Sequence, residues 1–224
     1  DLRELRPLDL AEYRSDDDFQ QRFREYLDQG LDLDWCVAID FTSSNGSPRE
    51  PGTHHYQDPT GALNDYEETL LAIGQALEAH SRSRQYPVWG FGARFGGAVR
   101  HLFQLGPTAT AAGVDGVLAA YRSIFASDLT LSGPTVLTEV LQKAATRARA
   151  HQVATRENQG VGDDARLRYT VLLIVTDGAA DQLEETQRRV AVYSPVPLSI
   201  VIVGVGSASE FDQMYRLQAP AEGC

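Results

Sequence analysis

The chain has 224 residues, of which 42% are hydrophobic and 23% are charged, a composition typical of one globular domain with a sizeable core. Its formal net charge of -11 argues against nucleic acid as the partner, because affinity for a phosphate backbone comes mainly from Lys and Arg. Its two cysteines give neither a disulfide framework nor the spacing of a zinc site, and no run approaches the roughly 20 apolar residues that span a bilayer. We therefore expect a cytoplasmic protein.

The first predicted element is an amphipathic helix that ends at Gly30. It begins after Ser15, a residue type that caps helix N-termini, and it carries Phe19, Phe23 and Leu27 on one face. Four short apolar runs then predict strands, at residues 35–41, 87–91, 171–176 and 198–205. Each run is apolar at consecutive positions, which indicates a strand covered on both faces, as in a parallel sheet between two layers of helices.

Helices are predicted between and after these strands, at residues 62–83, 113–126, 136–155, 182–192 and 209–218. The first of them is the clearest, because its apolar residues recur at spacings of three and four: Leu63, Tyr66, Leu70, Ile73 and Leu77. This alternation of strand and helix predicts an α/β fold with a doubly wound, mostly parallel central sheet flanked by helices.

Three polar or Gly-rich stretches predict loops. They are residues 43–61, residues 96–105, where we expect a short hairpin or edge strand, and residues 157–164, which we expect to be mobile. No internal repeat or linker composition divides the chain. We therefore expect one domain over residues 30–218, an N-terminal extension with a helix over residues 1–29, and a C-terminal tail over residues 219–224.

Polar side chains follow two of the predicted strands. Asp40, Thr42 and Ser44 leave the first strand at intervals of two residues, and Asp177 follows the strand at residues 171–176. Ligands of an open parallel sheet gather outside the carboxyl ends of its strands. Carboxylates and hydroxyls suit a hard cation such as Mg²⁺, and the absence of nearby Cys and His clusters argues against zinc.

The pattern Asp40-x-Thr42-x-Ser44 resembles the D-x-[ST]-x-S metal-ion-dependent adhesion motif of von Willebrand factor A domains, which are Rossmann-like. Further segments, in the same order, are similar to the copine variety of this domain: AIDFTSSNGSP, WGFGARF, GVDGVLAAYRS, LSGPTVL, YTVLLIVTDG and PLSIVIVGVGSASEFDQM. The resemblance covers about residues 20–217.

The resemblance implies a single site for Mg²⁺, or for Mn²⁺ or Ca²⁺. Thr42 and Ser44 would bind the ion directly, Thr135 directly or through water, and Asp40 and Asp177 directly or through bridging water. One coordination position would stay open for an acidic side chain of a protein partner. In relatives, movement of the Thr135 loop accompanies capture of the partner, and we treat the same movement here as a hypothesis.

The expected function is thus a divalent-cation-dependent protein-binding module and not an enzyme. The resemblance makes it the partner-recruiting A domain of a copine-like peripheral membrane protein, which would reach membranes only through calcium-dependent lipid-binding domains absent from this chain. The A domain of a copine-like ubiquitin ligase is an alternative. A scaffold that binds no metal is another, and it predicts no thermal shift on adding Mg²⁺ or Mn²⁺.

A metal-dependent hydrolase or phosphatase that uses Asp40 as its nucleophile is the rival class. Haloacid-dehalogenase-type phosphatases also begin with an Asp after the first apolar strand, but they carry a second Asp as general acid where this chain has Thr42. A Thr hydroxyl cannot do that work at neutral pH. No nucleophile with an adjacent base is evident elsewhere in the sequence.

The remaining polar and sulfur-containing residues near these motifs have simpler structural interpretations. We expect Asp181 to be a solvated acid, and Asp65, Glu67 and Glu68 to form a charged helix face. His54 and His55 are expected in a surface loop, because adjacent residues rarely converge on one ion. Cys36 is expected to be a small buried residue.

Overall fold

The computed structural model describes residues 24–28, 30–157, 167–178 and 180–206, together with residues 211, 214 and 217. Its main sheet has five strands in the order β10-β9-β1-β3-β6. In chain order these are β1 (Asp32–Asp40), β3 (Val88–Phe91), β6 (Phe103–Gln104), β9 (Arg168–Thr176) and β10 (Leu198–Gly204). Four of them are mutually parallel and only β6, at one edge, is antiparallel. The predicted mostly parallel sheet is therefore confirmed.

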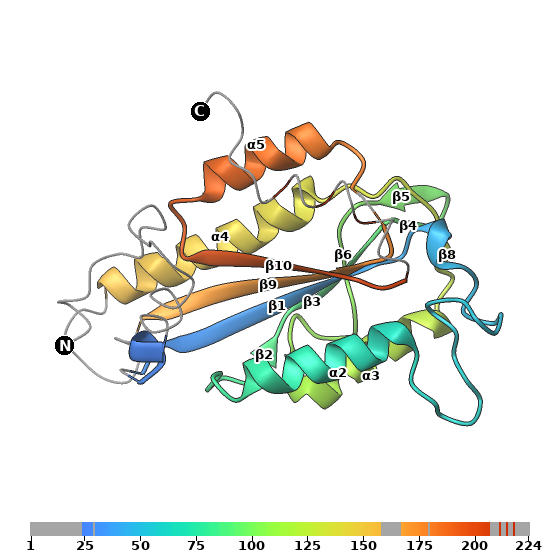
Figure 1. Cartoon of the computed structure of the whole chain (residues 1–224), viewed down its shortest axis with the longest axis horizontal. Helices are drawn as coiled ribbons and strands as arrows, with labels where there is room; N and C mark the ends of the chain where they lie inside the picture. The colour runs from blue at the N-terminus through green and yellow to red at the C-terminus, as the bar shows by residue number, and fades with distance from the viewer. Residues whose placement is uncertain are drawn as a thin grey trace.

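Two layers of helices cover this sheet (Figure 1). One layer contains α2 (Asp65–Glu78) and α3 (Gly113–Ser123), and the other contains α4 (Thr138–Glu157) and α5 (Leu183–Tyr193). Strands and helices alternate along the chain, and the helices lie on both faces, so the doubly wound α/β fold predicted from the sequence is confirmed.

The central strand β1 explains why its sequence is apolar at consecutive positions. All nine of its residues are buried. Trp35, Val37 and Ile39 pack with α2 and α3. Cys36 and Ala38 point the other way, into the core formed with α4 and α5. Each face of the strand thus has its own hydrophobic core, as the run of apolar residues indicates.

Short strands lie beside the main sheet, near the end of β1. β4 (Ala93–Phe95) pairs with β5 (Ala98–Arg100) and with β8 (Thr130–Leu131) to form a separate three-stranded sheet. This confirms the hairpin predicted near residues 96–105. Elsewhere β2 (Gln85–Tyr86) pairs with β7 (Ala111–Ala112), and the short segments η2 (Ser43–Asn45) and η3 (Ile124–Ala126) form 3₁₀ turns.

Helix α2 begins later than the sequence predicts. Asn64 is its N-cap: its side chain accepts a hydrogen bond from the Glu67 backbone, and the Glu67 side chain accepts one from the Asn64 backbone. This capping box sets the start of the helix. Leu63 therefore lies outside the helix and is 38% exposed, so its predicted place in the apolar stripe is wrong.

An ion pair fixes α4 against β1 near the start of that strand. Asp34 is buried, and Arg147 donates to both of its carboxylate oxygens, from Nε at 2.6 Å and from an Nη atom at 2.7 Å. The bidentate geometry orients the helix about the strand. The segment that precedes α4, residues 132–137, lies at the opposite end of the sheet, where β1 ends.

Some predictions fall on residues that the structure does not describe. These are most of the extension over residues 1–29, most of the mobile loop predicted at residues 157–164, most of the helix predicted at residues 209–218, and the tail. Residues 24–28 are helical, and Gly30 follows with a φ of 92°, which is the left-handed conformation expected after a helix. Within the described part of the chain, no helix has the length and apolar character needed to cross a membrane.

Candidate metal centre

The carboxyl end of β1 carries a buried carboxylate that is held from two sides. Asp40 is the last residue of β1 and is inaccessible to solvent. One carboxylate oxygen accepts a hydrogen bond from the Thr42 backbone at 2.8 Å, and the other accepts one from the Thr176 hydroxyl at 2.5 Å. The first bond comes from the turn that follows β1 and the second from the end of β9. The carboxylate orientation is therefore fixed by two strands at once.

Burial makes the charged form of Asp40 costly. It raises the pKa of this carboxyl to about 6, while the hydrogen bonds from Thr176 and Thr42 lower it and the charge of Asp177 raises it further. Among the described residues, no Lys, Arg or His side chain forms an ion pair with Asp40. A buried carboxylate of this kind is stabilised by a cation.

The turn after Asp40 presents two hydroxyls. The oxygens of Thr42 and Ser44 lie 3.1 Å apart, within hydrogen-bond distance. Thr42 is buried whereas Ser44 is exposed. Asn45 lies beneath them and donates from its amide to the Thr42 carbonyl at 3.2 Å and to the Thr42 hydroxyl at 3.4 Å. The hydroxyl pair thus spans the boundary between the core and solvent.

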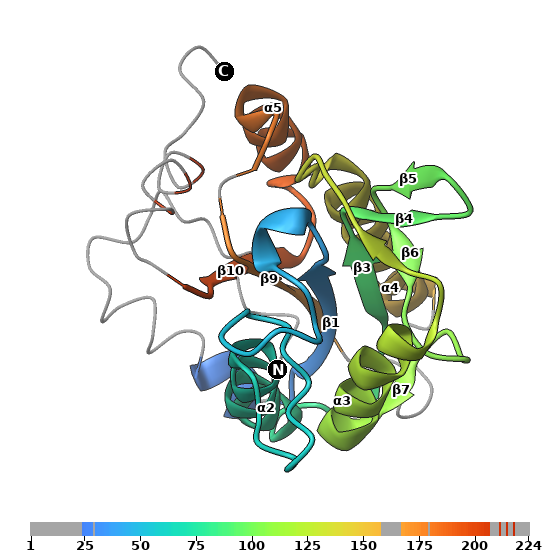
Figure 2. The same cartoon turned by 90° about the vertical axis from the view of Figure 1, so that its right-hand side faces the viewer.

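The segment that carries Thr135 reaches this turn by backbone pairing. Ser132 forms a parallel bridge with Thr42 and accepts a hydrogen bond from the Ser43 backbone at 2.5 Å. Its own backbone N–H donates to the carbonyls of Phe41 and Gly92. Thr135 follows three residues later and is buried. Figure 2 looks onto this edge of the sheet, with the turn after β1 facing the viewer.

Asp181 holds Thr135 from the other side, although it lies at the surface as expected. Its carboxylate accepts a hydrogen bond from the Thr135 backbone at 2.6 Å, and its own backbone N–H donates to the Thr135 carbonyl at 2.9 Å. The side chain is exposed, but it is paired with a main chain 46 residues away in the sequence. The sequence gives one indication of this role, which is that Asp181 lies four residues after Asp177.

Asp177 directly follows β9 and is buried. Parallel pairing of Ile39 with Val175 puts the ends of β1 and β9 next to each other. The structure therefore places all five predicted residues at one edge of the sheet. Asp40, Thr42 and Ser44 are joined there by direct hydrogen bonds, Asp177 acts on Asp40 through its charge, and Thr135 is attached through Ser132 and Asp181.

The donor set at this edge consists of two carboxylates and three hydroxyls. Within the described residues, no group of three or more His, Cys, Asp or Glu side chains that could hold a metal ion is found. This composition does not suit zinc, which is bound mostly by sulfur and nitrogen. It suits a hard divalent cation that takes oxygen ligands and keeps some water.

Two interpretations of polar residues are wrong. His55 is buried, not part of the loop surface, because Nε2 hydrogen-bonds to the Asp40 carbonyl and Nδ1 to the Tyr121 hydroxyl. Burial lowers the pKa of His55 to about 3, so the ring is neutral. Glu67 is likewise buried and pairs with Arg122, so the acids of α2 form more than a charged face.

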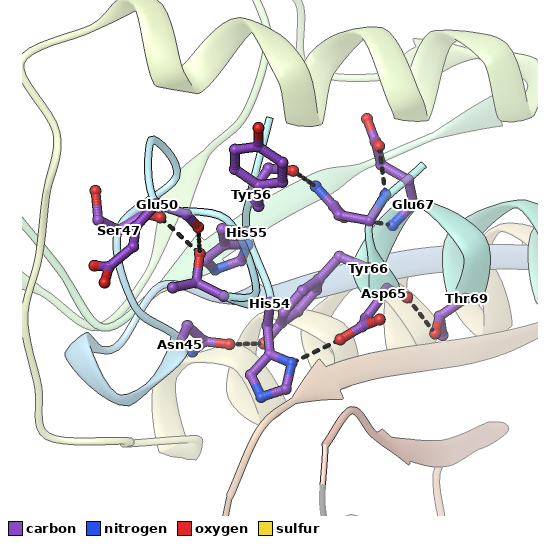
Figure 3. Close-up of polar contacts among 12 residues, drawn as sticks. Asn45, Ser47, Glu50, His54, His55, Tyr56, Asp65, Tyr66, Glu67 and Thr69 are labelled. Atoms are coloured by element: carbon purple, nitrogen blue, oxygen red, sulfur yellow. Dashed lines mark hydrogen bonds and ion pairs between the residues drawn. The ribbon is translucent and has the colours of Figure 1, made fainter. Parts of the chain in front are cut away.

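His54 and Asp65 join the loop to the start of α2. His54 is partly exposed, and its Nδ1 atom lies 2.7 Å from the Asp65 carboxylate (Figure 3). The two adjacent histidines thus point to different partners. No feature of the sequence near His55 signals its burial, because its partners lie elsewhere in the chain, Asp40 on β1 and Tyr121 on α3.

Comparison with known proteins supports one family. A family model described as Copine matches residues 53–222. Protein BONZAI 2 of Arabidopsis thaliana is 40% identical over 193 residues, which are 84% of this chain and 31% of that protein. Copine-E of Dictyostelium discoideum is 40% identical over 200 residues, which are 88% of this chain and 32% of that protein. The chain spans about a third of the length of the curated relatives it matches.

Among solved structures, the N-terminal domain of TFIIH p34 has a similar fold, with a TM-score of 0.54 and 16% identity. The match covers 84% of this chain and 88% of that domain. At this identity the likeness concerns the fold alone, which is that of a von Willebrand factor A domain. The family model and the sequence relatives show that this chain belongs to the copine family.

Proposed function

We propose that this domain is a divalent-cation-dependent protein-binding module, the partner-recruiting A domain of a copine-like peripheral membrane protein. The ion would be held by Asp40, Thr42, Ser44, Thr135 and Asp177. The observation that carries the proposal is the fixed, buried carboxylate of Asp40 beside a pair of hydroxyls 3.1 Å apart.

The donor set favours an ion that is shared with a partner. Mg²⁺ takes about six oxygen ligands, and five protein groups leave a position for one more. Ser44 is exposed while Asp40 and Thr42 are buried, so the ion would be approached from the Ser44 side. An acidic side chain of a protein partner in that position would add a third carboxylate to a divalent cation. Mn²⁺ and Ca²⁺ accept the same ligand types.

The geometry does not favour the phosphatase alternative. Both carboxylate oxygens of Asp40 accept hydrogen bonds and the side chain is inaccessible, which suits a ligand better than an attacking nucleophile. A phosphatase of this class would also need a lysine at this edge of the sheet, whereas the single lysine of the chain, Lys143, lies exposed on α4. Whether the domain serves a copine or a copine-like ubiquitin ligase concerns the rest of the protein and leaves the proposed role of the site unchanged.

Titration with Mn²⁺, followed by electron paramagnetic resonance, tests the proposal. We expect one saturable site in the wild-type domain and none in Thr42→Val, which keeps the side-chain shape and removes the hydroxyl. Glu68→Gln is the matched control, because it removes an exposed charge on α2 and no contact of the site. Equal binding by the wild type and Thr42→Val, or no binding by either, would contradict the proposal.

A further inference from the structure

One buried histidine lies next to the candidate metal site without contributing a ligand to it. His55 is the only buried residue between Gly46 and Leu63. All the other residues of this loop are exposed or partly exposed. The loop therefore inserts a single polar side chain into the core. The place of insertion is directly against the main chain of Asp40, where the distance from Nε2 to the carbonyl oxygen is 2.8 Å.

The directions of the hydrogen bonds follow from the donors and acceptors present. The Asp40 carbonyl can only accept, so the hydrogen of the neutral ring lies on Nε2. Nδ1 then accepts from the Tyr121 hydroxyl at 2.8 Å, and that oxygen accepts from the Asn64 amide at 3.2 Å. Asn64 is the N-cap of α2. One consistent chain of hydrogen bonds thus runs from the start of α2 to the backbone of Asp40.

The ring of His55 is also fixed by stacking. It lies between Phe41, at a centroid distance of 5.0 Å, and Tyr66, at 4.3 Å. The Tyr66 hydroxyl donates to the Asn45 side chain at 2.5 Å, and Asn45 in turn donates to the Thr42 carbonyl. The same cluster of rings therefore supports both ends of the segment from Asp40 to Thr42. Figure 3 shows the loop side by side with the start of α2.

We propose that His55 is a positioning residue of the metal site, which holds the backbone of Asp40 so that the carboxylate and the Thr42 hydroxyl face the ion together. This inference rests on the proposed function. A ligand set that is already oriented binds more tightly, because less conformational freedom is lost on binding. Residues that orient metal ligands typically change metal affinity by about 10- to 100-fold when they are removed.

Two substitutions separate the hydrogen bond from the packing. His55→Phe keeps a stacked ring and removes the donor to Asp40. His55→Gln loses the ring but can place an amide N–H near the position of Nε2. Leu70→Ala is the control for general destabilisation, because Leu70 is a buried residue of α2 whose side chain forms no hydrogen bond. Tyr121→Phe, which removes only the hydroxyl that holds Nδ1, replaces His55→Phe if that variant does not fold.

Mn²⁺ affinity of the folded variants is the first measurement. We expect His55→Phe to bind Mn²⁺ about 10- to 100-fold more weakly than the wild type. His55→Gln should recover most of this loss, and Leu70→Ala should bind like the wild type. Wild-type affinity in His55→Phe, or equally weak binding in His55→Gln, would overturn the proposal.

Amide hydrogen exchange without metal is the second measurement, and it separates this proposal from the proposed function. The Thr42 amide donates to the Asp40 carboxylate, and the Leu173 amide in β9 reports the stability of the sheet. In His55→Phe the protection of Thr42 should fall relative to Leu173, whereas in Leu70→Ala both should fall together. If the wild type binds no Mn²⁺, the proposed function fails. The ratio of Thr42 protection to Leu173 protection then tests the positioning role of His55 on its own. An unchanged ratio in His55→Phe would refute the positioning role.

Discussion

Replacing Asp40 by Asn in the metal-free domain should stabilise the fold at neutral pH. Burial raises the pKa of Asp40 from its ordinary value of 3.8 to about 6. Each unit of such a shift corresponds to about 1.4 kcal/mol. Keeping Asp40 ionised in the folded, metal-free state therefore costs about 3 kcal/mol relative to the unfolded chain. Asn removes this cost, and its amide oxygen can still accept one of the two hydrogen bonds that the carboxylate accepts.

The pH dependence isolates the charge from the lost hydrogen bond. Between pH 3.8 and about 6, the folded state keeps a proton on Asp40 that the unfolded chain has released. The contribution of Asp40 to stability is thus fully present below this window and is lost as the pH rises through it. Asn does not titrate. The free energy of unfolding of Asp40→Asn minus that of the wild type should therefore increase by about 3 kcal/mol across the window. The titration of His55 is common to both proteins and cancels.

Urea unfolding in the presence of EDTA, followed by circular dichroism on both sides of the window, measures this difference. A difference that does not change with pH would show that Asp40 carries no buried charge and would refute the reasoning. Saturating Mn²⁺ at neutral pH should reverse the order, because a bound ion stabilises only the folded state that binds it. Asp40→Asn should gain little or nothing from the metal.

Two other substitutions, one of them with a matched control, test the support of the site. Asp181→Asn weakens the hydrogen bond that holds Thr135, and we expect Mn²⁺ affinity to fall by about 10-fold with little change in the urea midpoint. Gly92→Ala adds a Cβ that would collide with the Thr42 side chain at a φ of 77°, whereas Gly97→Ala, at a φ of 85°, meets open space. Both glycine variants should lose stability from backbone strain. Calorimetry with Mn²⁺ should show weaker binding only for Gly92→Ala. Equal Mn²⁺ affinities of the two variants would contradict the close approach of Gly92 to Thr42.

The sequence predicts the fold well where burial follows from local pattern. The apolar run of β1 indicates burial on both faces, and the structure provides a core on each. The sequence also predicts that Asp40, Thr42 and Ser44 lie together, because their spacing alone puts them on one turn. Thr135 and Asp177 were predicted from the family resemblance. Their placement depends on the bridge between Ser132 and Thr42 and on the pairing of β1 with β9, which are contacts between distant parts of the chain.

The local sequence does not reveal the roles of the supporting residues His55 and Asp181. The burial of His55 depends on Tyr121, 66 residues away, and on aromatic rings from two helices. Asp181 owes its role to the Thr135 backbone, 46 residues away. A polar side chain that is satisfied by one distant partner has the same local sequence as one that faces water. Only the packed structure distinguishes the two cases.

A crystal structure of the domain grown with Mn²⁺ tests the central claim most directly, since the anomalous signal of the metal identifies its position. The account predicts one ion at the carboxyl edge of the sheet. Its ligands should include the hydroxyls of Thr42, Ser44 and Thr135, with Asp40 and Asp177 binding directly or through water. A carboxylate from a neighbour or a water should fill the remaining position. An ordered turn at residues 40–45 with no metal beside it, at a Mn²⁺ concentration that saturates any site found in solution, would contradict the account.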